Sequence, residues 1–169
     1  MASEDDGLVA AAYSPCNVHT FIGRTAVELS EVTDYPFRGT VRITVNPAVP
    51  ISFSLRLRIP AWADGARIHV NGEVQPTPAS AAFAKVQRTW KRGDIVELQF
   101  PLTPRFVRGY KDSISIDRGA LVFSLPIGES WVKLQDRGMT ADWQVFPATQ
   151  WNYALAADTG NATAITTQE

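Results

Sequence analysis

The sequence predicts an all-β protein: an antiparallel, jelly-roll-like β-sandwich followed by an incomplete second β-domain. Apolar and polar residues alternate in many short runs, which is the pattern of strands that bury one face. Turn residues separate these runs, and 11 prolines and 11 glycines are spread through the chain, so no long helix is expected. Closely spaced strands joined by short turns favour an antiparallel sandwich.

The strongest alternation covers residues 51–59, where apolar residues occupy the odd positions and Ser or Arg the even ones. The same pattern recurs over 41–45 and 96–100, with shorter runs at 27–29, 68–70 and 114–116. Each run predicts a strand with its apolar side toward a core and its polar side outward.

Turn signals lie between the predicted strands. Asn71-Gly72 is the strongest of them, because both central positions of a type I′ hairpin turn need positive φ angles. Asp64-Gly65 and residues 91–94 mark two further turns.

The chain divides into four predicted parts. Residues 1–7 are acidic and form a disordered start, and residues 8–110 supply a complete sandwich. Residues 111–155 begin a second sandwich that is too short to close by itself. Residues 156–169 are rich in Ala and Thr without periodicity, so we expect a flexible tail.

Charge and composition narrow the classes of partner. The chain has 16 basic and 17 acidic residues and a net charge of −1, which argues against a nucleic-acid groove or an anionic membrane surface. No apolar run reaches the roughly 20 residues that span a bilayer. The first residues lack the basic and apolar regions of a signal peptide. The single cysteine, Cys16, fits the cytoplasm but leaves the compartment undetermined.

Six short segments carry a further signal when they are taken together. They are residues 33–37 (Thr-Asp-Tyr-Pro-Phe), 53–62 (Phe-Ser-Leu-Arg-Leu-Arg-Ile-Pro-Ala-Trp), 70–73 (Val-Asn-Gly-Glu), 88–94 (Arg-Thr-Trp-Lys-Arg-Gly-Asp), 117–123 (Asp-Arg-Gly-Ala-Leu-Val-Phe) and 151–155 (Trp-Asn-Tyr-Ala-Leu). In this order and spacing they resemble the region that follows the catalytic barrel in the β-L-arabinofuranosidases of glycoside hydrolase family 127 and its relatives. The resemblance covers about residues 7–155.

The resemblance implies an accessory role. Such enzymes carry an (α/α)6 barrel with the active site, followed by two β-sandwich domains, and this chain is similar to the first sandwich and the opening of the second. Their zinc ion, held by three cysteines and a glutamate, would belong to the absent barrel, so we expect no cofactor in this chain. The expected partner is the barrel; arabinose-containing glycans and a second copy of the chain are further candidates.

The residues themselves also argue against catalysis. One cysteine cannot supply a multi-thiolate zinc site. His19 and His69 have no triad partners nearby in the sequence, and His69 is expected on the outer face of its strand. A glycosidase pair needs two carboxylates across a sugar-sized gap. The candidates, read as solvated loop residues, are Asp112, Asp117, Glu129, Asp136 and Asp142. We therefore predict no catalytic, cofactor-binding or metal-binding residue.

Seven residues are candidates for contact with a sugar or with the barrel. Tryptophans combine a large apolar ring with a polar handle, and arginines are common at interfaces. Packing or docking is the preferred interpretation of the tryptophans, and a polar outer sheet face explains the arginines. The candidates are Trp62, Trp90, Trp131, Trp143, Trp151, Arg56 and Arg58.

Two alternatives to the accessory role stay open. The chain could be a carbohydrate-binding module that uses exposed tryptophans, which requires Trp62 and Trp90 to line an open face. It could also be a non-functional fragment of a truncated reading frame, in keeping with its acidic start and unfinished second sandwich.

Overall fold

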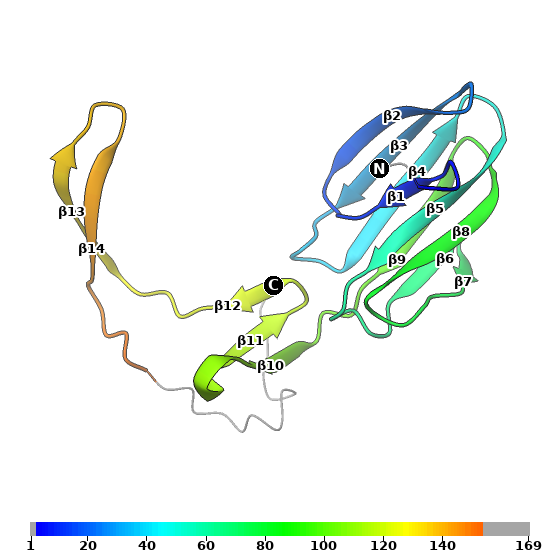
Figure 1. Cartoon of the computed structure of the whole chain (residues 1–169). Coiled ribbons are helices and arrows are strands. Elements are labelled where there is room, and N and C mark those ends of the chain that lie inside the picture. Colours follow the sequence, from blue (N-terminus) through cyan, green and yellow to red (C-terminus); the bar gives the residue numbers. More distant parts are fainter. Residues whose placement is uncertain (1–2, 154–169) are drawn as a thin grey trace. The chain divides into compact units, whose positions relative to one another are not determined.

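A computed structural model describes residues 3–153. As predicted, it is all-β, with no α-helix among the described residues (Figure 1). Over the same range, no helix is long and apolar enough to cross a membrane. The strands are β1 (Leu8–Ala10), β2 (Cys16–Ile22), β3 (Thr25–Thr33), β4 (Thr40–Pro47), β5 (Ile51–Ile59), β6 (Arg67–Val70), β7 (Glu73–Gln75), β8 (Ala82–Trp90), β9 (Asp94–Gln99), β10 (Pro104–Arg108), β11 (Ile114–Arg118), β12 (Leu121–Phe123), β13 (Glu129–Asp136) and β14 (Ala141–Pro147), with a 3₁₀ turn, η1, at Tyr110–Asp112.

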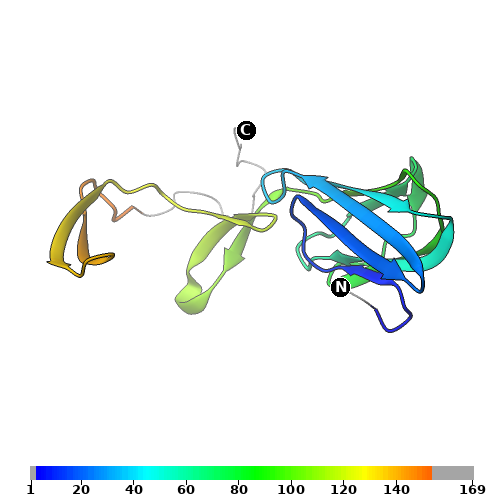
Figure 2. The ribbon, with the colours of Figure 1, turned by 90° about the horizontal axis from the view of Figure 1, so that it is seen from above.

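Two sheets form the sandwich, which Figure 2 shows from a second direction. The larger sheet has the strand order β2-β3-β4-β9-β6-β7 and is antiparallel throughout. The smaller sheet has the order β1-β5-β8. Its β1 strand runs parallel to β5, which the sequence did not predict, while β8 is antiparallel to β5.

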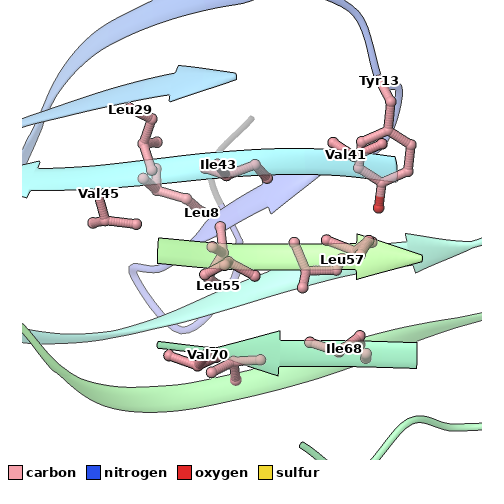
Figure 3. Packing of buried hydrophobic residues seen from close by; sticks show 14 of the residues in the cluster. Leu8, Tyr13, Leu29, Val41, Ile43, Val45, Leu55, Leu57, Ile68 and Val70 are labelled. Carbon is pink, nitrogen blue, oxygen red and sulfur yellow. The ribbon is translucent and has the colours of Figure 1, made fainter. Parts of the chain in front are cut away.

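The inner faces of both sheets contribute to one buried cluster. Leu55 and Leu57 of β5 come from the smaller sheet, and Ile43 of β4 and Val70 of β6 come from the larger one (Figure 3). The odd-numbered apolar residues of 51–59 point inward as predicted, and four of the five are at most 3% exposed. Each such side chain contributes about 1.5–3 kcal/mol by leaving water.

The turns follow the predicted chemistry. Asn71 and Gly72 have φ angles of 52° and 85° and join β6 to β7 as a tight hairpin. The turn at 91–94 is closed by a 3.1 Å hydrogen bond from the amide of Asp94 to the carbonyl of Lys91. It carries the chain from β8 in the smaller sheet to β9 in the larger one.

The described part of the chain's start, residues 3–7, lies beside β5 of the smaller sheet. Residues 3–7 form a turn in which the amide of Ser3 donates to the carbonyl of Gly7. Asp5 in this turn accepts a 3.0 Å hydrogen bond from the hydroxyl of Ser54. Ser54, which alternation places on the exposed face of β5, is therefore only 1% exposed.

The described residues divide into two compact units. One contains residues up to 104 together with 117–121, and the other contains 105–116 and 122–153. The sequence places the boundary after residue 110. Strands β10, β11 and β12 form a three-stranded sheet. The predicted tail over 156–169 lies outside the described residues.

The second unit holds the β13–β14 hairpin. Its strands pair antiparallel from Glu129↔Pro147 to Asp136↔Ala141, with an irregularity between Lys133 and Gln135. Every residue of β13 is exposed, and so are the last five of β14. A two-stranded hairpin without a covered face is marginally stable at best.

Removal of the Trp90 side chain should destabilise the sandwich strongly. Trp90 is 0% exposed, and its indole N–H donates a 3.0 Å hydrogen bond to the carbonyl of Phe53. We expect Trp90→Ala to lower the free energy of unfolding by about 3–5 kcal/mol, measured by urea denaturation. Phe83→Ala removes an exposed ring from the same strand and should cost less than about 1 kcal/mol. Equal losses for the two variants would contradict this account.

Candidate functional site

Trp90 is a core residue and offers no ring to a ligand. Its ring packs 5.7 Å from that of Phe53, and the guanidinium of Arg88 lies 5.4 Å above it. Because the side chain is fully buried, a sugar cannot stack on it in the folded domain. The open tryptophan face that a carbohydrate-binding module would need is therefore absent at this position.

Trp62 belongs to an aromatic cluster, which we call the aromatic end: Tyr13, Tyr35, Trp62 and Phe100. The rings of Trp62 and Tyr35 are stacked, with an interplanar angle of 12° and centroids 6.4 Å apart. Phe100 packs against both of them, 5.6 Å from Trp62 and 6.1 Å from Tyr35. Trp62 is half-buried against the core. Its ring is therefore used mainly for internal packing.

The hydroxyl groups of the aromatic end stay protonated. The Tyr13 hydroxyl donates a 2.8 Å hydrogen bond to the carbonyl of Arg58. Burial, followed by the nearby Glu31 carboxyl, raises the pKa of Tyr13 well above its usual range. Burial also raises the pKa of Tyr35. Neither tyrosine is suited to act as a base near neutral pH.

Trp62 also lies against the turn at Gly119. A Cβ atom at Gly119 would be 3.4 Å from two carbons of the Trp62 ring and 2.6 Å from Leu102. Gly119 has a φ angle of +63°, so both space and backbone conformation favour glycine there. Trp62 thus packs against residues 117–121 within the first unit.

Arg56 and Arg58 hold the chain's own N-terminal segment. An Arg56 nitrogen lies 3.3 Å from a carboxylate oxygen of Asp5, and the ammonium of Lys85 lies 2.7 Å from the same oxygen. Arg58 donates a 3.4 Å hydrogen bond to the carbonyl of Ala11. The outer face of the smaller sheet is thus partly covered by residues that precede and follow β1.

The three remaining tryptophans lie in the second unit and are exposed. Trp131 and Trp143 contact each other edge to face, 6.1 Å apart, on paired strands of the hairpin. The Lys133 ammonium lies 5.5 Å from the centre of the Trp143 ring. The Trp131 indole donates a 2.8 Å hydrogen bond to Glu129. Trp151 is 61% exposed. These rings are available to a partner.

Two of the candidate carboxylates on the hairpin, Asp136 and Asp142, are paired with cations. Asp136 lies 3.0 Å from Lys133, and Asp142 lies 2.6 Å from Arg137. The Lys133 hydrogen bond lowers the pKa of Asp136, whereas a glycosidase acid needs a raised value. Among residues 3–153, no group of three or more His, Cys, Asp or Glu side chains could hold a metal ion.

Glu31 is a buried carboxyl that the sequence analysis missed. It is 9% exposed, and burial raises its pKa. It accepts a 2.8 Å hydrogen bond from the amide of Ser14. Glu31 lies beside an apolar cavity of about 290 Å³ between the sheets, lined also by Leu29 and Leu55. Since Glu31 follows the inward positions 27 and 29, strand periodicity gave the signal for its burial.

A second missed feature is a shallow depression of about 260 Å³ on the outer face of the larger sheet. Its residues come from β4, β6, β9 and the β6–β7 turn, and they include Arg42, His69 and Glu97. His69 lies on the outer face, as predicted. The alternation within each strand predicts that these residues point outward. Which of them become neighbours depends on the register between the strands, which the sequence pattern does not give.

The two-sheet fold, closed at one end by aromatic packing, defines a β-sandwich module. Residues 7–102 match the family model of the β-L-arabinofuranosidase GH127 middle domain. The chain belongs to the GH127 glycoside hydrolase family, of which the matched residues form the middle domain. This confirms the resemblance inferred from the six segments.

Solved structures agree with this assignment. A GH127 β-L-arabinofuranosidase from Geobacillus stearothermophilus T6 is 31% identical, with a TM-score of 0.66, over 71% of this chain and 20% of that one. A glycoside hydrolase (24% identity, TM-score 0.63) is matched over 89% of this chain and 30% of its own. A GH127 β-arabinofuranosidase (19%, 0.62) is matched over 85% and 28%. The last two show the shared fold alone.

The chain therefore spans between a fifth and a third of the length of these structures. No curated protein matches the chain.

The Asp5 cluster should make the sandwich sensitive to acid. Hydrogen bonds from Lys85 and then Ser3 hold the pKa of Asp5 far below its usual range. A carboxyl with a lowered folded-state pKa stabilises the protein above its unfolded value, near 4, and this contribution is lost as the pH falls further. We expect Asp5→Asn to lower the urea midpoint at pH 7. Below about pH 4, the midpoint of this variant should decrease less with falling pH than that of the wild type.

Asp64→Asn is the matched control, because Asp64 is an exposed turn carboxylate. It should leave the dependence of the midpoint on pH unchanged. If the urea midpoint of Asp5→Asn depended on pH in the same way as that of the wild type, protonation of Asp5 would not be coupled to folding. Salt at high concentration should reduce the effect of Asp5→Asn at pH 7.

Proposed function

We propose that this chain is a non-catalytic accessory module of a β-L-arabinofuranosidase-like glycoside hydrolase and braces that enzyme's catalytic (α/α)6 barrel. The observation that carries the proposal is the match of residues 7–102 to the middle domain of this family. The partial coverage of the solved relatives supports it, since most of their length lies outside the matched region.

The chemistry of the chain is consistent with a supporting role. A zinc site with several thiolates needs more than the one cysteine of this sequence. Cys16 is exposed on β2, and Asp136 and Asp142 are each neutralised by a neighbouring cation. We therefore assign zinc binding, hydrolysis and substrate specificity to the barrel.

The β13–β14 hairpin supports the presence of a partner. One face carries Trp131, Trp143 and Val145, and the other carries Val132 and Phe146. All five are between 45% and 57% exposed. A hairpin that is apolar on both faces is unusual on a free surface and indicates contact with further polypeptide. We propose that additional parts of the parent enzyme cover it.

The isolated chain should self-associate through this hairpin. We expect the weight-average mass in analytical ultracentrifugation to rise with concentration, because exposed apolar faces associate. The double variant Trp131→Ser/Trp143→Ser should reduce that rise. Phe37→Ser, which removes an exposed ring from the first unit, should not. A wild-type chain that stays monomeric at all concentrations would contradict the proposal of a covered hairpin.

The bracing role is tested with a separately produced GH127 catalytic barrel. We expect the full chain to bind the barrel, to raise its midpoint of thermal inactivation and to increase its activity on an L-arabinofuranoside. Bovine serum albumin at equal mass serves as a control for non-specific protection. Absence of binding, together with unchanged barrel stability, would overturn the bracing role. The chain alone should show no hydrolysis.

A further inference from the structure

The depression on the larger sheet is built on one continuous row of paired residues. The register places Arg42 of β4 opposite Glu97 of β9, and Glu97 opposite His69 of β6. Val32 of β3 and Val74 of β7 extend the same row at its two ends. Five strands thus contribute one residue each to the outer face, with charged and polar groups in the centre.

The central groups retain hydrogen-bonding capacity. Glu97 accepts a 2.8 Å hydrogen bond from the side chain of Gln99, which leaves its other acceptor positions open. Arg42 makes no hydrogen bond or ion pair within residues 3–153. The Nδ1 atom of His69 is buried and has no partner in the same range.

The rim of the depression is held rigidly. The Asn71 side chain accepts a 2.8 Å hydrogen bond from the amide of Ile95 and donates a 2.9 Å hydrogen bond to Asp94. The amide of Asn71 donates in turn to the carbonyl of Ile95. These contacts fix the β6–β7 turn against β9. The depression is therefore preformed, which lowers the entropic cost of ordering it around a ligand.

The mixture of groups selects a neutral ligand with several hydroxyls. Glu97 disfavours an anion and Arg42 disfavours a cation. A hydroxyl can donate to the Glu97 carboxylate while its neighbour accepts from Arg42, and His69 can donate or accept. Ile95 of the lining adds apolar surface for a C–H face, and the 75%-exposed Val74 lies next to the depression, opposite His69. A sugar ring with adjacent hydroxyls satisfies all of these features together.

We propose that this depression, which no tryptophan lines, is a binding site for a neutral glycan unit. The site goes beyond the bracing role, because it lies wholly on the larger sheet and needs no barrel residue. It is also distinct from a tryptophan platform, since Arg42, Glu97 and His69 supply the contacts. Its function would be to hold a glycan chain on the accessory module.

Saturation-transfer NMR on the intact chain tests the site with methyl β-L-arabinofuranoside and an L-arabinofuranosyl disaccharide as probes. The method observes the sugar, so self-association of the protein does not prevent it. We expect saturable millimolar binding. Glu97→Gln and Arg42→Ala should each weaken it about tenfold or more, because each removes a charged hydrogen-bonding group.

Glu28→Gln is the matched control, since Glu28 also points outward on the larger sheet but lies outside the depression. It should change the affinity by less than about twofold. Circular dichroism checks that each variant is folded, and Glu97→Gln, being nearly isosteric, decides the result if Arg42→Ala unfolds. No binding by the wild type, or binding that survives Glu97→Gln, overturns the proposal.

Binding that is lost instead in Trp131→Ser/Trp143→Ser also overturns it and would favour a tryptophan platform. The outcome is independent of the barrel experiment. The chain can bind the barrel and fail to bind sugar, or bind sugar and fail to bind the barrel, so the two proposals fail separately.

Discussion

Side chains from the inner faces of the two sheets meet in one apolar cluster, and the rest of the sandwich depends on this contact. Leu57 of β5, Val41 and Val45 of β4 and Ile68 of β6 all have an exposed fraction of 0%. Because the side chains of a strand alternate between its faces, burying these residues also fixes which residues face outward. The polar row on the larger sheet and the charged cluster on the smaller sheet follow from the same packing.

The outer faces of the two sheets are used differently. On the smaller sheet, Asp5 returns over β5 and β8 and contacts Arg56, Lys85 and Ser54, so the chain covers part of its own polar face. On the larger sheet, Arg42 makes no hydrogen bond or ion pair within the described range, whereas Arg56 of the smaller sheet is paired with Asp5. Arg56 and Arg58, the arginines that the sequence analysis singled out, therefore contact the chain's own Asp5 and Ala11. The ligand site is proposed on the opposite sheet for the same reason.

The second unit differs from the first in how few of its apolar side chains are buried. In the first unit, nearly every inward side chain has a partner across the sandwich, whereas the β13–β14 hairpin exposes apolar residues on both faces. Hydrogen bonds between two strands cannot compensate for that exposure in water. The family match over residues 7–102 covers the sandwich, whereas the exposed apolar faces of the hairpin are what support the proposed contact with further polypeptide.

The sequence by itself determined the all-β class, the inward residues of β4, β5 and β9, the Asn71-Gly72 turn and the family, because these depend on local alternation, φ preferences and motif order. It missed β8, whose inward positions include the small Ala84 and the charged Arg88 and therefore give a weak apolar signal. Tertiary structure alone decided that Trp90 is enclosed, that Asp5 covers Ser54, and that Arg42, Glu97 and His69 share one row. Those outcomes depend on register and on contacts between residues distant in the chain, which no local pattern encodes.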